Sequence, residues 1–316
     1  MGAHLMANSS CPVCENINVE LHGAYRATHL TFIGLHRAHC NSCGMVFASP
    51  MPDNKALEEY NSSYFASAHA GQPHGVVATA FFSGIARLRL IYVERYLRKH
   101  NITVASLMEL GPGPGFFARN WLAKHPTTTY LAIETDTSCH APLQNIGVQL
   151  VGTPSMADKN TSVDLIVMSH VLEHVTNPAE FLKDATRSLR SGGAIFIEVP
   201  CRDWEHKPID EPHLLFFDKK PMHQLLNQLG FDHIEVSYHG QEIDRLRSTS
   251  KLRTGLSALR SKLIALGLVA PFARIRSGME MLTDPLERAA VAPFDAHCES
   301  SKPAWWLRAM ARKTSD

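Results

Sequence analysis

Glu109-Leu110-Gly111-Pro112-Gly113-Pro114-Gly115 is the stretch that decides the fold. It ends the apolar run Val104–Leu110, which we expect to be a strand, and it precedes a helix that we expect to begin near Phe116. Glycines let the backbone approach a ligand closely, and the first turn of a helix offers it free N–H groups. The sequence therefore predicts a strand, a ligand-binding loop and a helix in succession.

An acid at the end of the next predicted strand narrows the kind of ligand. Glu134 follows Gly115 by 19 residues, and an acid in this place accepts hydrogen bonds from the hydroxyls of a ribose. A dinucleotide-binding loop would have its third glycine where this chain has Phe116. The pattern thus favours a nucleoside ligand without a pyrophosphate. The alternative is that there is no binding site here, only a glycine- and proline-rich turn beside an unrelated surface acid.

The chain as a whole divides into three parts. Residues 1–52 contain two cysteine pairs, residues 53–100 read as a helical connector, and residues 101–316 alternate apolar runs with helical patterns. Such alternation is typical of an α/β protein with a parallel sheet. Further strands are expected at Tyr130–Glu134, Val148–Val151, Val163–Ser169, Ala194–Val199, Phe231–Tyr238 and Ala304–Ala311, with a basic helical insertion at about 241–301.

The cysteine pairs have the spacing of a zinc site. Cys11 and Cys14 form one CxxC pair, and Cys40 and Cys43 form another, with 25 residues between the two pairs. Two such pairs supply the four thiolates that tetrahedral zinc prefers, and a closed four-cysteine site is structural rather than catalytic. The alternative is four unpaired core cysteines. Seven cysteines, an odd number, also fit a reducing compartment, so we expect a cytoplasmic protein.

Three motifs, in order, resemble those of the class I S-adenosylmethionine-dependent methyltransferases. They are ELGPGPG at 109–115, AIETD at 132–136 and VDLIVMSHVLEH at 163–174. The resemblance covers about residues 105–240. It implies a Rossmann-like α/β core, a seven-stranded sheet whose last strand, Ala304–Ala311, is antiparallel, and S-adenosylmethionine as cofactor.

The same resemblance implies which residues touch the cofactor. Ser169 and His170 would lie near the transferred methyl group, and Thr153–Met156 would flank the adenine. The remaining contacts would come from the glycine-loop strand and the acid after the next strand, namely Glu109, Gly111, Gly113, Gly115 and Glu134.

The cysteine module joined to this core resembles bacterial methyltransferases that modify sugars and natural products. The resemblance implies O-methylation of a sugar, nucleotide-linked or in a glycan, or of a related small metabolite. C-methylation of a nucleotide-linked keto-sugar is an alternative, although those enzymes have a His-Glu-His run where this chain has Glu211-Pro212-His213. A rival from another class is a zinc-ribbon nucleic-acid-binding protein with a non-catalytic Rossmann core, which the intact glycine loop and Glu134 disfavour.

Two histidines are candidate bases for an alcohol acceptor. His213 follows the exit of the fifth predicted strand, and we expect Glu211 to orient its ring and Phe216 and Phe217 to pack beneath its loop. His170 ends the fourth predicted strand and is the competing candidate. It also begins an HxxEH pattern with Glu173 and His174. The position after a core strand argues against a metalloprotease, and the pattern leaves open either a divalent-ion site at Glu173 and His174 or a role in organising the loop.

Bulk composition sets the limits for partners. The formal net charge is +1, 45% of residues are hydrophobic, and we expect no transmembrane segment and no signal peptide. Residues 245–276 contain eight Lys or Arg and no Asp or Glu, with Leu256, Leu259, Leu263 and Leu266 at helical spacing. This stretch is either a solvated face packed over the core, or a lid or homodimer element that attracts an anionic acceptor or an anionic membrane surface. It has one aromatic residue, Phe272, and no series of aromatic residues to stack on nucleic-acid bases, so we expect no nucleic acid.

Overall fold

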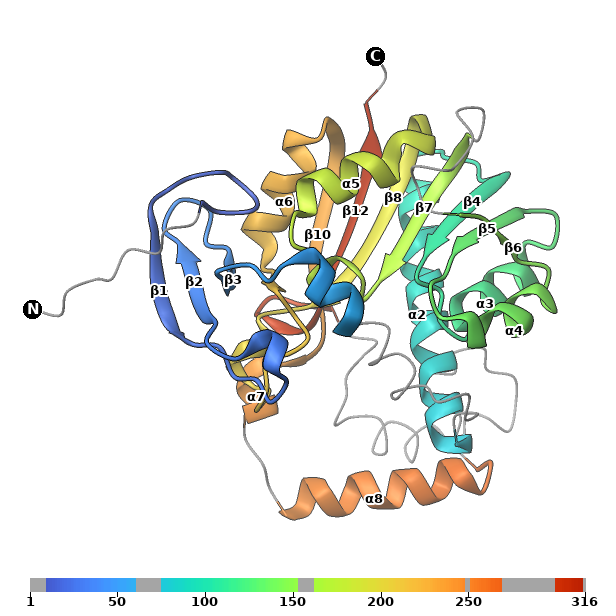
Figure 1. Ribbon diagram of the computed structural model, residues 1–316. Helices are drawn as coiled ribbons and strands as arrows, with labels where there is room; N and C mark the ends of the chain where they lie inside the picture. Colours follow the sequence, from blue (N-terminus) through green and yellow to red (C-terminus); the bar gives the residue numbers. More distant parts are fainter. Residues whose placement is uncertain (1–9, 61–74, 153–161, 248–250, 269–298, 315–316) are drawn as a thin grey trace, which may run out of the picture.

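An eight-stranded mixed sheet forms the centre of the protein (Figure 1). The computed structural model describes residues 10–60, 75–152, 162–247, 251–268 and 299–314, and side chains 251–254, 256–257 and 260 also lie outside the description. Across the sheet the strands are β11 (Glu299–Ser300), β10 (Phe231–Glu242), β12 (Ala304–Lys313), β8 (Leu189–Pro200), β7 (Val163–Ser169), β4 (Ser106–Leu110), β5 (Thr129–Ile133) and β6 (Gln149–Leu150).

The reversed last strand is confirmed. β12 lies between β10 and β8 and is antiparallel to both, whereas β8, β7, β4, β5 and β6 are mutually parallel. The eighth strand, one more than expected, is the two-residue β11 at the edge. Chain order reverses between β4 and β7, and open α/β sheets bind ligands at the carboxyl ends of the strands at such a point.

Alternate side chains of each central strand enter two different cores. In β7, Leu165 and Val167 face one core, and Ile166 and Met168 face the other. Successive strand residues point to opposite faces, and a parallel sheet with both faces covered is apolar on both. The first core lies under α2 (Val76–Lys99), α3 (Phe116–Lys124) and α4 (His140–Gln144), and the second under α5 (Pro178–Ala185) and α6 (Lys219–Gln228) (Figure 1).

Local signals explain where the helices near the ligand edge begin. Gly115, at φ 79°, precedes the first residue of α3. The side chain of Asn177 accepts a hydrogen bond from the Glu180 backbone N–H, and Pro178 is the first residue of α5.

The short 3-10 helices are η1 (Leu30–Phe32), η2 (Thr137–Cys139), η4 (Leu172–His174), η5 (Thr186–Ser188) and η6 (Asp203–Glu205).

Helix α2 is the long helix of the predicted connector. Residues 54–60 are also helical, and residues 61–74 lie outside the description. Among the described residues, α2 alone has the length and apolar character to cross a membrane, but its buried face, including Tyr92 and Tyr96, packs against the sheet. Its character is that of a core helix.

A second, four-stranded sheet contains three strands of the N-terminal segment and one short strand from the loop that follows β8. Its order is β1 (Val19–Ala24), β2 (His36–Cys40), β3 (Val46–Ser49) and β9 (Leu215–Phe216). β9 pairs antiparallel with β3, opposite Val46 and Phe47. Phe216 and Phe217 are buried as expected, but Phe216 lies in this strand.

The basic insertion contains the helices α7 (Ile243–Arg247) and α8 (Lys251–Ala265). In α8 Ile264 is buried and Leu259 is exposed, and Leu266, expected on the same apolar stripe, is exposed just after the helix ends. Residues 248–250 and 269–298 of the insertion lie outside the described chain.

Candidate active site

A cavity of about 440 Å³ opens at the carboxyl ends of β4 and β7, where the chain order reverses. Backbone of the glycine loop forms one wall, and Ser169 and His170 form another. Aromatic side chains from α2, α3 and β12 complete it, namely Phe81, Phe82, Phe116, Phe117, Trp305 and Trp306. The glycine loop, Glu109, Ser169 and His170 thus meet at one cavity, as the sequence predicts.

The glycine loop has a backbone that other residues would strain. Gly111 and Gly115 have φ of 65° and 79°, in the left-handed region. A Cβ at Gly111 would lie 2.8 Å from Val171 Cγ2, and one at Gly115 would lie 2.8 Å from Leu143 Cδ2. Both positions therefore need glycine for conformation and for space.

Glu134 lies directly against the loop. Its carboxylate accepts hydrogen bonds from the Gly113 N–H at 2.7 Å and from the Asp136 N–H at 2.8 Å, one on each oxygen. Each carboxylate oxygen can accept further hydrogen bonds. The acid and the loop that the sequence pairs are in contact, and Thr153–Met156, expected beside them, lie outside the described residues.

Glu109 is a buried carboxyl at the floor of the cavity. Burial raises its pKa to about 7, although the hydrogen bond donated by the Tyr130 hydroxyl opposes the rise. A buried acid poised near neutrality becomes ionised when a cation approaches it. Glu109 therefore suits a positively charged ligand.

His170 is held between two buried carboxylates. Its Nδ1 lies 3.3 Å from Glu173 Oε1, and its Nε2 lies 3.3 Å from Glu198 Oε1. Burial alone would lower the pKa of His170, but the two carboxylates outweigh it and raise the pKa above the ordinary value of 6.5. A histidine with such a pKa is suited to exchanging a proton near neutral pH.

Glu198 already has two strong cationic partners. Arg89 Nε donates to its Oε1 at 2.8 Å, and Arg308 Nε donates to its Oε2 at 2.6 Å. Burial would raise the pKa of Glu198, but the two guanidinium groups hold it well below the usual range. Glu198 therefore joins His170 to two arginines, whereas Glu173 contacts His170 and His174.

His213 stands outside the lining of this cavity. Its Nδ1 donates to Asp203 Oδ2 at 2.6 Å, so Asp203 orients the ring. Glu211, expected in that role, instead accepts hydrogen bonds from the backbone N–H groups of Thr28 and His29, both at 3.0 Å. The expectation for Glu211 is wrong because the N-terminal segment, distant in sequence, folds over this loop and takes its carboxylate.

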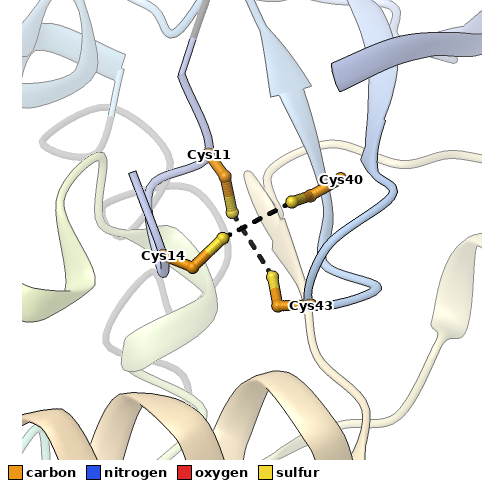
Figure 2. A group of neighbouring side chains, drawn as sticks. All are labelled: Cys11, Cys14, Cys40 and Cys43. Atoms are coloured by element: carbon orange, nitrogen blue, oxygen red, sulfur yellow. Dashed lines mark hydrogen bonds between the residues drawn. The ribbon is translucent and has the colours of Figure 1, made fainter. Parts of the chain in front are cut away.

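The four cysteines come together as the spacing predicts (Figure 2). The Sγ atoms of Cys11 and Cys43 lie 3.5 Å apart, as do those of Cys14 and Cys40, and all four lie within 4.8 Å of one another. A tetrahedral zinc with bonds of about 2.3 Å requires sulfur atoms about 3.8 Å apart. The cluster therefore fits a zinc ion with little rearrangement.

The cysteine-bearing module is joined to the His213 loop by several contacts. Arg26 and Arg37 both pair with the buried carboxylate of Asp210. The Tyr25 hydroxyl donates to the His213 carbonyl at 2.9 Å. With β9 in its sheet, the module and this loop share one packed region.

Comparison with known proteins identifies the class of the core. Residues 85–236 match the family model of a methyltransferase domain. The family model and the Rossmann-like sheet confirm the predicted fold and the predicted domain of a S-adenosylmethionine-dependent methyltransferase.

Individual relatives align over shorter lengths. The chain is 31% identical over 118 residues to an uncharacterised 37.1 kDa protein in a transposon of Streptomyces fradiae, covering 34% of this chain and 33% of that protein. It is 39% identical over 62 residues to a ubiquinone biosynthesis O-methyltransferase of Parvibaculum lavamentivorans, covering 19% of this chain and 24% of that enzyme. The chain thus matches a third or less of the length of these two proteins.

Among solved structures, a plantazolicin methyltransferase in complex with SAH covers 83% of this chain and 91% of its own, with 14% identity and a TM-score of 0.43.

Proposed function

We propose that this protein transfers a methyl group from S-adenosylmethionine to a hydroxyl oxygen of a small acceptor, with His170 as the base. The observation that carries the proposal is the cavity in which the glycine loop, Glu109 and His170 meet. The ubiquinone-pathway relative is by name an O-methyltransferase, which supports oxygen as the accepting atom.

One set of residues would bind the cofactor, and His170 would act on the acceptor. Glu134 and the loop N–H groups would hold the ribose, and Glu109 would stabilise the charged methionine part of the cofactor. S-adenosylmethionine supplies an already activated methyl group, so alignment of the acceptor oxygen provides much of the acceleration. S-adenosylmethionine would supply the methyl group and be released as SAH, and the imidazole of His170 would accept the hydroxyl proton of the acceptor.

Glu173 completes this arrangement as a positioning residue. Its carboxylate faces His170 Nδ1 at 3.3 Å and would help to hold the imidazole in place. The same charge stabilises the imidazolium after the proton has moved. Because Glu198 is neutralised by two arginines, it does not compete strongly for His170.

The acceptor that we propose is a sugar or a related small metabolite. Trp305, Trp306 and Phe82 line the cavity, and aromatic side chains suit the apolar C–H groups on one side of a sugar ring. The basic insertion would favour an acceptor with a phosphate or diphosphate, because its charge attracts anions.

We further propose that Cys11, Cys14, Cys40 and Cys43 hold one structural zinc. Three of the thiols are buried and the fourth is partly buried, so a bound ion would have no room for a reacting ligand. The zinc would order the N-terminal segment and, through β9, the loop that follows β8.

A comparison of three histidine variants tests the assignment of the base. His170→Ala should lower turnover about 100-fold or more, the range for a lost general base, while SAH affinity changes little. His213→Ala, which removes a side chain outside the cavity, should have a smaller effect on turnover. His223→Ala, on the exposed face of α6, is the matched control.

Radiolabelled methyl transfer to a panel of nucleotide sugars and phenols would measure these rates, and fragmentation of the product would locate the methyl group. Near-normal turnover of His170→Ala with a strong loss in His213→Ala would overturn the assignment. Methylation at carbon would overturn the proposed reaction.

A further inference from the structure

Three metal-binding side chains meet beside the active-site cavity and away from the cysteines. Glu173, His174 and His213 each offer one ligand atom, and these atoms lie within 4.8 Å of one another. His174 Nε2 is 3.9 Å from Glu173 Oε1, and the rings of His174 and His213 are 4.9 Å apart in an edge-to-face arrangement. The sequence leaves open a divalent-ion site at Glu173 and His174, and the fold brings His213 to these two residues as a third potential ligand.

The buried carboxylate of Glu173 has no well-aligned hydrogen-bond donor among the described residues. Glu173 is 1% exposed, and within the described part of the chain neither of its oxygens has a hydrogen-bond donor of good geometry. Its two ion-pair contacts, with His170 Nδ1 at 3.3 Å and His174 Nε2 at 3.9 Å, are both made by Oε1 and leave room for a further ligand. Buried carboxylates without a partner are costly, and in native proteins they are paired or coordinate a metal.

Both imidazoles already have a second partner that fixes how they point. His213 Nδ1 donates to Asp203, whose other contact is Lys207 Nζ at 2.9 Å, and His213 Nε2 keeps its lone pair. His174 has a hydrogen bond to the backbone of Pro212. A histidine that donates one N–H to a carboxylate or carbonyl and offers its other nitrogen is the usual arrangement around a protein-bound metal.

Backbone contacts hold the two segments together without any metal. The Leu214 N–H donates to the Glu173 carbonyl at 2.8 Å, and the His213 N–H donates to the Asp210 carbonyl at 3.0 Å. The three ligands are therefore positioned before an ion arrives, and only small side-chain rotations are needed to reach bonds of about 2.1 Å.

We propose that Glu173, His174 and His213 form a second metal site, which binds a divalent first-row transition ion, Zn²⁺ in the first place. Two imidazoles and one carboxylate favour such ions over Mg²⁺ or Ca²⁺, which prefer oxygen ligands alone. Three protein ligands leave an open coordination position. Glu173 contacts His170, which lines the cavity, so the proposed site is one residue away from the cavity wall. The site does not depend on the proposed methyl transfer, because its test is metal binding itself.

Cobalt titration of the full-length protein, prepared with one zinc per chain by elemental analysis so that only the cysteine site is filled, separates this site from the cysteines. Wild-type protein should bind one further equivalent of Co²⁺ with weak visible bands and without the intense sulfur-to-cobalt absorption that thiolates give. His213→Ala and Glu173→Gln should weaken this binding more than 100-fold, and Asp203→Asn about 10–100-fold, the range for a residue that orients a ligand. His223→Ala should bind as wild type does.

Two results would overturn the proposal. The first is a wild-type protein that binds no Co²⁺ beyond the cysteine site, or binds it with strong thiolate absorption. The second is unchanged cobalt affinity in His213→Ala and Glu173→Gln while circular dichroism shows both variants folded. The first measurement uses the wild-type protein alone, so misfolded variants do not obscure the answer.

Discussion

Replacing Glu134 by Ala should weaken SAH binding about 30-fold. The carboxylate uses one acceptor position on each oxygen for the Gly113 and Asp136 N–H groups, and a further position on each oxygen is left for a ribose hydroxyl. Hydrogen bonds to a charged group contribute about 1.5–3 kcal/mol each, and water replaces part of this in the variant. A net loss of about 2 kcal/mol corresponds to the expected change in Kd.

Isothermal titration calorimetry with SAH measures this change directly. Glu58→Ala, which removes an exposed carboxylate from the helical segment 54–60, controls for the loss of one negative charge. Thermal unfolding of Glu134→Ala without ligand shows whether the loop still folds. If the variant is folded and binds SAH with wild-type affinity, Glu134 does not hold the ribose, and the assignment of the glycine loop to the cofactor fails with it.

Three further outcomes are expected. Cys40→Ser should lose one equivalent of zinc by elemental analysis and unfold at a lower temperature, because the binding energy of such a site is folding energy; unchanged zinc content would contradict the site. Glu198→Gln should lower the free energy of unfolding in urea by about 3–5 kcal/mol, since it leaves Arg89 and Arg308 without their buried anion; a loss under 1 kcal/mol would show that the pairs are weak. Turnover should rise with pH through a midpoint above 6.5, because only neutral His170 accepts a proton and its pKa is raised. Glu173→Gln removes one of the charges that raise this pKa, so it should move the midpoint to lower pH. A midpoint that Glu173→Gln leaves in place would exclude His170 as the titrating group.

Residues with a local signal could be predicted from the sequence. The glycine loop, Glu134, Ser169 and His170 each stand at the end of an apolar run, and strand ends are readable from such runs. The four cysteines were predicted in the same way, because CxxC spacing is itself a local signal. The glycine loop, Ser169 and His170 line one cavity at the edge of the sheet, and Glu134 contacts this loop. The four cysteines form a separate cluster.

The partners of these residues depend on sheet register, which no local pattern reveals. Glu198 reaches His170 because β8 pairs with β7 so that Glu198 is opposite Ser169, and Arg308 meets Glu198 because the two are opposite in β12 and β8. A charged residue in the middle of each apolar run was the available signal. Asp203 gave no such signal, because its contact with His213 arises from the path of a loop.

The pairing of β9 with β3 has a consequence for anyone who shortens this chain. Removal of the first 52 residues would take away Arg26 and Arg37 and leave the buried carboxylate of Asp210 without a cation. It would also expose the free edge of Leu215–Phe216, an apolar segment with unpaired backbone groups that invites aggregation. The cysteine module and the methyltransferase core should therefore be expressed, transplanted and evolved as one piece.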